Sequence, residues 1–361
     1  MNDADLAAYL AECRELALAE VRRFLPRNRR FGPLLYDLVL DYPFRTGKAL
    51  RPALCIATCR ALGGALESVL PTAAVLELFH NAFLIHDDVE DGSELRRDQP
   101  TLHRQHGVPI AVNVGDSMLA LALRPLLENT ALLGLGKALR ILDVVARMAR
   151  ESAEGQALEL AWIRRGMWNL PDTEYFRMVY KKTAWYTFVA PLLLGAIAAG
   201  AAPPVLTRLR RFGGRLGVAF QIRDDVLNLI ADPRRYGKET AGDLWEGKHT
   251  LVLLHALRHA TPQDRAEAET TLLKPRPPIP IDEREELRHM VEHQRFKTAA
   301  EIQKLATMID RSESIPYARD VGRRWTARAR TALRDLDGAL VPGPHRNVLL
   351  HLVDFVSDRD S

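Results

Sequence analysis

Residues 77–103 carry the signal that decides the fold, and they read ELFHNAFLIHDDVEDGSELRRDQPTLH. The first half is apolar at spacings of three and four residues, which predicts a buried helix. Asp87, Asp88 and Asp91 stand at the end of this helix. Because positions i and i+4 share one helix face, the three carboxylates should lie close together and repel one another unless cations bind.

A second acidic pair lies in another apolar segment, FGGRLGVAFQIRDDVLNLI, over residues 212–230. Asp224 and Asp225 form the pair, and Asn228 stands where a third aspartate would repeat the first spacing. Aspartates are rarely buried without a partner, so two such motifs in one chain argue against a solvated surface. A ligand set made of oxygen alone favours magnesium, which can also take phosphate oxygens from a substrate.

Helical patterning continues along nearly the whole chain. Ala, Leu, Glu and Arg dominate, and glycine and proline fall between the helical stretches. We therefore expect an all-α fold with a single domain over residues 1–361, built from about ten or more helices around a central cavity. The proline-rich segment 262–282 is expected to form a loop.

The composition favours a soluble protein that acts on an anionic substrate. The 361 residues include 50 Lys+Arg and 46 Asp+Glu, so the net charge of +4 does not by itself indicate nucleic acid. Cys13, Cys55 and Cys59 form no disulfide framework, and we interpret them as core residues in a reducing compartment. The acidic, amphipathic N-terminus differs from a signal peptide, so we expect a cytoplasmic protein.

One uncharged run, from Ala184 to Thr207, is long enough to cross a membrane. It contains prolines and glycines, and its second half is rich in alanine. We therefore interpret it as a helix buried in the protein core and expect no transmembrane segment.

Basic side chains suited to phosphate oxygens accompany both aspartate motifs. Arginine can bind phosphate through paired hydrogen bonds, and lysine supplies a compact charge. Taken singly, each would be an ordinary surface charge. The candidates are Lys48 and Arg51 in TGKALRP, Arg96 and Arg97 after the first motif, Lys182 in YKKTA, and Lys238 and Lys248 in YGKETAGDLWEGKHT.

These segments, together with NVGDSMLALA at 113–122, occur in the order found in the trans-isoprenyl diphosphate synthases, and the chain resembles that family from about residue 47 to residue 249. The resemblance implies an isoprenoid synthase bundle, usually a homodimer, in which both aspartate motifs face a central cavity. It also implies the head-to-tail trans condensation of isopentenyl diphosphate with an allylic diphosphate.

The resemblance assigns roles to individual residues. Magnesium, as three ions with substrate bound, would be held by Asp87, Asp88, Asp91, Asp224 and Asp225. The allylic diphosphate would be contacted by Arg96, Lys182, Lys238 and Lys248. Isopentenyl diphosphate would be bound by Lys48, Arg51, His80 and Arg97. Thr183 and Gln221 match polar residues placed near the reacting carbons.

Two positions depart from the family pattern. Ala49 stands where many members have arginine, and Asn228 replaces the last aspartate of the second motif. The amide of Asn228 still offers a neutral oxygen, so we expect weaker charge rather than lost metal binding. The departures leave open a catalytically poor subunit or one that depends on a partner.

The residues before Asp87 bear on product length. Four and five residues back, about one helical turn, lie Phe83 and Ala82. Phe83 would form the floor of the cavity and the small Ala82 would leave space beside it, which predicts a C20 product, geranylgeranyl diphosphate. Plain helix packing of the two side chains stays an alternative.

Other functions also stay open. The product could be C15 farnesyl diphosphate or a longer chain. A terpene cyclase would ionise one allylic diphosphate without the isopentenyl-binding set, and a non-catalytic subunit would bind a partner synthase. His289, Glu292 and His293 match an HxxEH metalloprotease pattern, but no third ligand is evident and we do not assign that function.

Overall fold

The computed structural model describes residues 1–27, 30–230, 241–277 and 295–358. These residues are helical almost throughout. The strands among them are one antiparallel pair, β1 (Leu95–Arg96) and β2 (Gln99–Pro100). The all-α prediction is confirmed.

The helices form one layered assembly, and η1 and η2 have wide turns of the π type. In chain order they are α1 (Asp3–Phe24), η1 (Gly32–Tyr36), α2 (Asp37–Phe44), α3 (Leu50–Ala61), α4 (Leu70–Asp91), α5 (Leu102–His106), α6 (Val108–Leu121), α7 (Leu123–Leu133), α8 (Leu135–Arg165), α9 (Asp172–Val179), η2 (Tyr180–Val189), α10 (Ala190–Ala198), α11 (Pro203–Ile230), α13 (Gly242–Glu246), α14 (Leu251–His259), α15 (Pro262–Leu273), α17 (Ala299–Arg311), α18 (Ser314–Arg334) and α19 (Pro344–Asp358).

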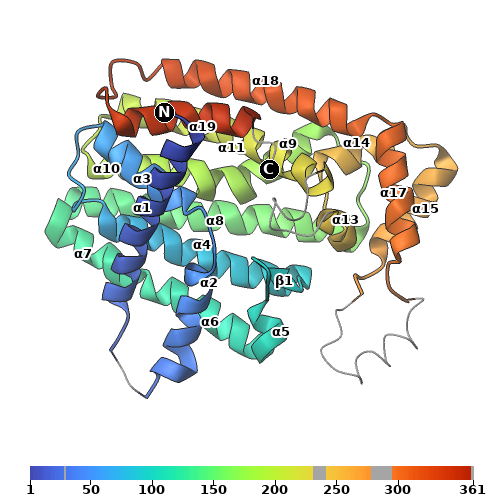
Figure 1. Cartoon of the computed structure of the whole chain (residues 1–361), viewed down its shortest axis with the longest axis horizontal. Helices are drawn as coiled ribbons and strands as arrows, with labels where there is room; N and C mark the ends of the chain where they lie inside the picture. Colours follow the sequence, from blue (N-terminus) through green and yellow to red (C-terminus); the bar gives the residue numbers. More distant parts are fainter. Residues whose placement is uncertain (28–29, 231–240, 278–294, 359–361) are drawn as a thin grey trace.

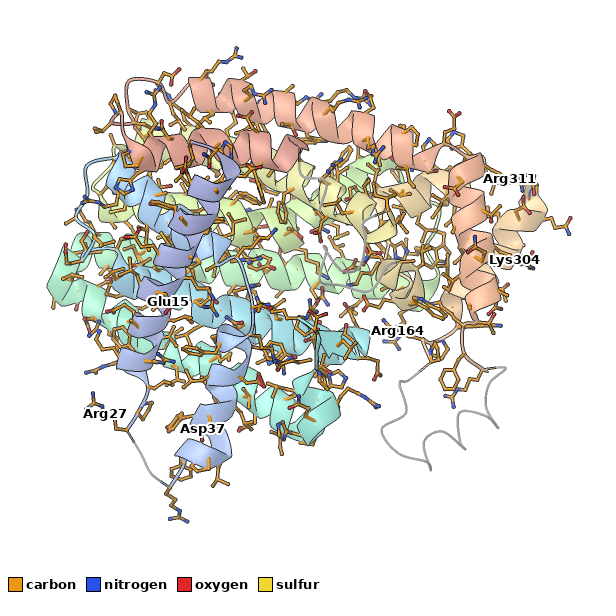
Figure 2. All side chains as sticks on the ribbon, viewed as in Figure 1. Glu15, Arg27, Asp37, Arg164, Lys304 and Arg311 are labelled. Atoms are coloured by element: carbon orange, nitrogen blue, oxygen red, sulfur yellow. The ribbon has the colours of Figure 1, made fainter. Side chains whose placement is uncertain are left out.

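The aspartate motifs lie on helices in the interior of this assembly. Helices α4 and α8 run through the middle of the view, and α18 lies along the upper edge beside α11 (Figure 1). Helices α6 and α7 lie toward the opposite edge. Charged side chains such as Glu15 on α1 and Lys304 on α17 are exposed on the outer helices (Figure 2).

The uncharged run from Ala184 is part of the core, as expected. Helices η2 and α10 cover most of it, and Trp185, Phe188 and Leu192 are almost completely buried. Among the described residues, a different stretch, Val108–Leu133, is apolar and long enough to cross a bilayer. It comprises α6 and α7, and a single stretch of this kind is weak evidence for a membrane span.

The expectation of a loop over residues 262–282 is wrong for its first part. Helix α15 occupies Pro262–Leu273, because Pro262 stands in the first turn and Thr261 caps the helix by accepting a hydrogen bond from the Asp264 backbone N–H. The prolines that suggested a loop begin after the helix. Residues 278–282 and the HxxEH pattern lie outside the described residues.

The three cysteines are buried and free, which agrees with their interpretation as small core residues. Cys55 and Cys59 lie on α3 within the larger of two hydrophobic clusters. The smaller cluster is formed around α9, α14, α17 and the first half of α18.

Candidate active site

The first aspartate motif stands at the carboxyl end of α4. The helix ends at Gly92, whose φ of 63° allows a left-handed turn that most side chains disfavour. The chain then reverses through the β1–β2 pair and returns Arg96 to the motif. The helix end and the hairpin together therefore build one wall of the site.

Asp88 is completely buried and fully held by hydrogen bonds. The Arg96 Nε donates to Asp88 Oδ1 at 3.0 Å, and the Tyr42 hydroxyl donates to Asp88 Oδ2 at 2.6 Å. Burial still raises the pKa of Asp88, although Arg96 and Tyr42 oppose the shift. Asp88 is thus fixed in position before any ligand binds.

Asp87 pairs with a lysine from a different helix. The Lys182 Nζ on η2 lies 3.1 Å from Asp87 Oδ1 and 2.5 Å from Glu159 Oε2 on α8. Burial alone would raise the pKa of Asp87, but Lys182 and Lys248 lower it below its usual range. The Lys182 ammonium group therefore forms ion pairs with both the Asp87 and the Glu159 carboxylates.

The position of Lys182 depends on close helix packing. A Cβ atom added to Gly155 on α8 would lie 2.3 Å from the Lys182 backbone nitrogen. Glycine at position 155 therefore lets η2 approach α8 closely enough for Lys182 to reach both carboxylates.

Asp91 pairs with Lys248, which follows the short helix α13. The Lys248 Nζ lies 3.0 Å from Asp91 and 2.8 Å from Glu246, and the Ser93 hydroxyl donates to Glu246 at 3.1 Å. Burial raises the pKa of Asp91 to about 7, against the opposing effect of Lys248. A divalent cation would relieve the cost of an ionised Asp91 at this place.

A buried lysine supports the segment that carries Lys248. The Lys297 Nζ donates to the Trp245 backbone carbonyl at 2.6 Å, at the end of α13. Burial lowers the pKa of Lys297 to about 8. This contact joins Lys297 to α13, the short helix that precedes Lys248.

The second aspartate motif is held by neutral donors. The Tyr175 hydroxyl donates to Asp225 Oδ2 at 2.6 Å, and the Gln221 amide donates to Asp225 Oδ1 at 2.7 Å. Burial and the neighbouring Asp243 raise the pKa of Asp225 well above its usual range. Asp224, the preceding residue on α11, is half-buried.

Two consecutive residues of η2 connect the motifs. Lys182 contacts Asp87 of the first motif, and the Thr183 hydroxyl donates to Gln221 at 2.9 Å, which in turn holds Asp225. π-type turns are often found at functional sites, and here they present successive side chains to both motifs. Helix η2 thus contacts both α4 and α11, and a metal site shared by the two motifs stays a prediction.

Asn228 has a structural partner rather than an open oxygen. Its Oδ1 accepts a hydrogen bond from the Asp243 backbone N–H at 3.1 Å, and its backbone carbonyl accepts one from Ala241 at 2.7 Å. The side chain thereby anchors the start of α13 to α11. The neutral oxygen that we expected to face a metal ion is already engaged in this contact.

The residues expected to bind isopentenyl diphosphate come from α3, α4 and the β1–β2 turn. The Arg51 Nη2 donates to Thr187 at 2.8 Å, and the Arg97 Nη1 donates to the Tyr42 carbonyl at 2.9 Å. Burial, with the nearby charges of Arg51 and Arg97, lowers the pKa of His80 well below its usual range. A neutral histidine beside two arginines is suited to an anionic ligand.

Two buried polar atoms in this set have no hydrogen-bond partner among the described residues. They are Nδ1 of His80 and Nε of Arg51. Buried donors and acceptors are normally satisfied, so these atoms mark a place where a polar ligand would fit. Lys48 is exposed, and its Nζ lies 5.4 Å from the centre of the Phe355 ring on α19.

The pair expected to set product length lies just before Asp87. The half-buried Phe83 ring packs edge-on against Phe79, at 5.8 Å between centroids, and against Tyr186 of η2, at 5.7 Å. Ala82 is completely buried in the larger cluster. Phe83 therefore belongs to an aromatic group next to the site, whereas Ala82 faces packed core.

Several residues of the site escaped the sequence analysis. Tyr42, Tyr175, Glu159 and Glu246 each hold a motif residue or its lysine partner. Glu159 was the one with a usable signal, because it is an acidic residue on the apolar side of α8. Lys238 lies outside the described residues.

An all-α bundle with two buried aspartate motifs and basic side chains between them defines a site for a substrate that carries phosphate groups. The family model for polyprenyl synthetases matches residues 33–306. The chain belongs to the polyprenyl synthetase family, which confirms the resemblance found in the sequence motifs.

Proteins related in sequence are prenyl diphosphate synthases. The geranylgeranyl diphosphate synthase of Methanosarcina mazei is 36% identical over 220 residues, which are 60% of this chain and 66% of that protein. The geranylfarnesyl diphosphate synthase of Aeropyrum pernix is 30% identical over 316 residues, which cover 87% of this chain and 90% of that one.

A solved structure agrees over nearly the full length. The geranylgeranyl pyrophosphate synthetase from Pyrococcus horikoshii superposes with a TM-score of 0.82 and 28% identity, and the match covers 99% of both chains. The whole bundle therefore follows the architecture of this family.

Proposed function

We propose that the protein is a magnesium-dependent prenyltransferase that condenses isopentenyl diphosphate with an allylic diphosphate. The observation that carries this proposal is the link between the aspartate motifs: Lys182 pairs with Asp87, and Thr183 joins Gln221 and Asp225. The names of its relatives, all synthases of prenyl diphosphates, support the same activity.

The basic residues would bind and then stabilise the departing diphosphate. Lys182, Lys248 and Arg96 now pair with carboxylates and would turn to the phosphate oxygens of the allylic substrate. Their charges favour breaking of the allylic C–O bond, because negative charge builds up on the diphosphate. The Thr183 hydroxyl donates a hydrogen bond to the Gln221 side-chain oxygen, so its own oxygen lone pairs are available to the allylic cation.

Isopentenyl diphosphate would be held by Arg51, His80 and Arg97 beside this cation. Its double bond then forms the new C–C bond, and a proton leaves the adjacent carbon for the departed diphosphate. The buried His80 stays neutral and serves binding rather than proton transfer.

The donor set fits magnesium ions. Five carboxylates, three of them (Asp88, Asp91 and Asp225) with pKa values raised by burial, supply the hard oxygen ligands that this ion prefers. Lys182 and Lys248 pair with Asp87 and Asp91, so these ion pairs would open as the two carboxylates take up the metal. When bound, magnesium would neutralise the diphosphate charge.

For the product, we propose C20 geranylgeranyl diphosphate. Phe83, packed against Phe79 and Tyr186, stands one turn from Asp87 and would stop the growing chain. Relatives are named after geranylgeranyl, geranylfarnesyl and octaprenyl products, so the aromatic group of this chain is the basis for the choice.

We also propose a cytoplasmic homodimer. Helices α6, α7 and α8 expose a row of aliphatic side chains, among them Leu123, Leu127, Leu135 and Leu139, each more than half exposed. A contiguous apolar surface of this kind is costly in water and is typical of a subunit interface.

The decisive assay is incubation with magnesium, isopentenyl diphosphate and C5, C10 or C15 allylic primers, followed by analysis of product length. The proposal predicts elongated prenyl diphosphates, which disappear on chelation of magnesium. A cyclised hydrocarbon made without isopentenyl diphosphate would indicate a terpene cyclase. Activity only after addition of a partner synthase would indicate a regulatory subunit.

A further inference from the structure

The outer surface of α18 is strongly basic. The helix contains one acidic residue, Asp320, and its six arginines are all exposed: Arg319, Arg323, Arg324, Arg328, Arg330 and Arg334. Arg319, Arg323, Arg330 and Arg334 are separated by four, seven and four residues, so they lie on one side of the helix and form a continuous stripe.

The first half of α11 extends this surface. Arg208 Nη1 donates to the Asp335 carbonyl at 3.1 Å, and Arg215 Nη1 donates to the Arg328 carbonyl at 3.0 Å, so arginines of α11 lie against α18. Together, residues 203–215 and 314–337 contain ten arginines, three aspartates, and neither lysine nor glutamate. We call the surface formed by the six arginines of α18 with Arg208, Arg211 and Arg215 of α11 the arginine face.

The charge of the arginine face exceeds that of the whole protein. The chain carries a net charge of +4, so the remaining residues are acidic on balance. Asp320 pairs with Arg323 and Arg324 at 3.2 and 3.0 Å, and Asp354 of α19 pairs with Arg330 at 2.6 Å. Exposed pairs of this kind neutralise only part of the surface and contribute little to stability. The concentration of arginine therefore needs another explanation.

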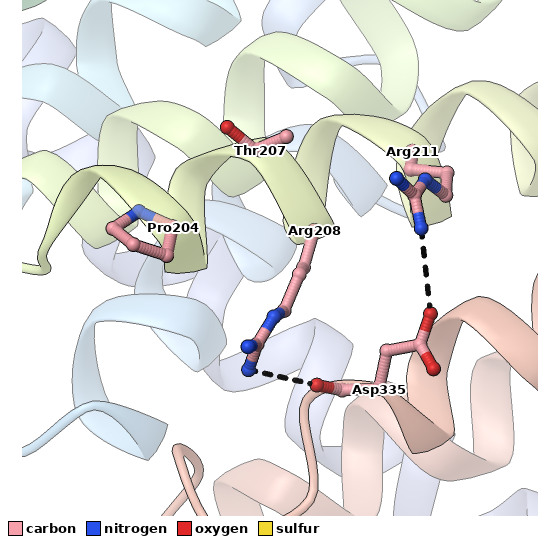
Figure 3. Close-up of a pocket in the computed structure, with 5 residues that line it drawn as sticks. All are labelled: Pro204, Thr207, Arg208, Arg211 and Asp335. Atoms are coloured by element: carbon pink, nitrogen blue, oxygen red, sulfur yellow. Dashed lines mark hydrogen bonds and ion pairs between the residues drawn. The ribbon is translucent and has the colours of Figure 1, made fainter.

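A hollow lies in the arginine face, between α11 and the end of α18. It has a volume of about 410 Å³ and is lined by Pro204, Thr207, Arg208, Arg211 and Asp335. The guanidinium groups of Arg208 and Arg211 extend from α11 toward Asp335 at the end of α18 (Figure 3). Arg208 donates a hydrogen bond to the Asp335 backbone carbonyl, and Arg211 forms an ion pair with the Asp335 carboxylate at 3.6 Å. Guanidinium groups bind phosphate oxygens well in such a position.

Exposed aliphatic side chains border the arginine face. Val341, in the loop that follows α18, is 56% exposed, and Leu350, one turn before Asp354 on α19, is 39% exposed. Nucleic acid would use the arginines but gain nothing from aliphatic contacts. Arginines beside aliphatic groups suit the headgroup region of a bilayer, where charge and short apolar insertions act together.

We propose that the arginine face is a docking surface for an anionic lipid bilayer. It lies on the edge opposite α6 and α7, so it would remain accessible in the proposed homodimer (Figure 1). Basic clusters bind anionic lipid headgroups through the summed attraction of their charges. The proposal does not depend on the prenyltransferase activity.

Vesicle flotation tests it with the full-length protein. Vesicles of phosphatidylcholine alone are compared with vesicles containing about 30% phosphatidylglycerol. We expect the wild type to float with the anionic vesicles only and to be released at about 0.5 M salt, where charge interactions are screened. The substitutions Arg319→Gln, Arg323→Gln, Arg330→Gln and Arg334→Gln, made together, should weaken binding at least ~10-fold.

A matched control removes the same charge elsewhere. Arg27→Gln, Arg164→Gln, Arg165→Gln and Arg177→Gln change four exposed arginines away from the face; Arg27 and Arg164 are visible in Figure 2. This variant should float like the wild type, and both variants should keep the wild-type thermal midpoint and elongate a short soluble primer normally. Equal binding by the α18 variant, binding to phosphatidylcholine alone, or tighter binding to duplex DNA or RNA would overturn the proposal.

Discussion

The Lys182 Nζ lies 3.1 Å from Asp87 Oδ1, so the ammonium group of this η2 lysine already occupies the first aspartate motif. The same ammonium group lies 2.5 Å from Glu159, and both carboxylates together favour its charged form despite burial. Before a diphosphate arrives, this pairing lowers the cost of keeping Asp87 ionised. When it arrives, Lys182 has a nearby anion to which it can turn.

Removing this cation should slow the chemical step. Lys182→Gln is expected to lower kcat for elongation about 100-fold or more, because one preorganised charge facing the departing diphosphate is lost. The matched control is Lys181→Gln. Lys181 is the preceding residue and pairs with Glu151 and Glu154, away from both motifs. Steady-state kinetics that show equal losses for the two variants would contradict a role specific to Lys182.

Product length should respond to Phe83. Phe83→Ala removes the ring that packs against Phe79 and Tyr186, and chromatography of the products should show chains longer than those of the wild type. Ala82→Phe is expected to shorten them, but Ala82 is fully buried, so this larger side chain also costs about 1–3 kcal/mol of stability. Unchanged products from Phe83→Ala would remove the residue from this role.

Asn228 offers a test of the incomplete second motif. Asn228→Asp keeps an oxygen that can accept from the Asp243 N–H and adds a negative charge near Asp225, so half-maximal activity should need less magnesium. Asn228→Ala loses the anchor of α13 and should raise KM for the allylic diphosphate instead. A magnesium titration giving the same midpoint for Asn228→Asp and wild type would rule out an effect of the missing charge.

The stability of the protein should fall in mild acid because of His249. This buried ring stacks on Trp168 at 4.0 Å, and burial lowers its pKa to about 4. An unfolded histidine titrates near 6.5, so between about pH 6.5 and 4 the unfolded state binds the extra proton and unfolding becomes easier as the pH falls.

Replacing the ring isolates this contribution. His249→Phe keeps an aromatic ring next to Trp168 but cannot bind the proton. Urea unfolding should show that the variant loses about 2 kcal/mol less than the wild type between pH 7 and pH 5. An identical pH dependence for both proteins would show that His249 does not carry the effect.

The proposed homodimer depends on the apolar row over α6–α8. Leu127→Glu and Leu139→Glu, at side chains 63% and 54% exposed, should give a monomer by light scattering. Leu273→Glu changes a leucine that is 60% exposed on α15 and should leave the mass unchanged. If the wild type is itself a monomer, the homodimer proposal is wrong and the apolar row serves another contact.

The sequence was sufficient for the fold class and for the residues of both motifs, because helical periodicity and repeated aspartate spacing are local patterns. It could not show the partners. Tyr42 and Tyr175 each donate to one aspartate, yet each is a single tyrosine in a short helix and forms no motif. Such contacts arise from packing between segments far apart in the chain.

One expectation failed for an identifiable reason. Residues 262–273 were assigned to a loop because of prolines further along, whereas the first proline stands where a helix tolerates it, at the first turn. The bond between Asn228 and the Asp243 backbone could not be predicted either, because it depends on α13, whose position the sequence does not reveal; the expected place of Asn228 at the metal site stays a prediction.

Binding of an unreactive allylic thiodiphosphate, measured by calorimetry with and without magnesium, tests most directly whether both acidic helices serve one ligand. The account predicts that Asp87→Asn and Asp225→Asn each abolish most of the magnesium-dependent affinity, while Asp310→Asn, an exposed residue on α17, binds like the wild type. Wild-type affinity in either motif variant would mean that the two motifs do not share a site.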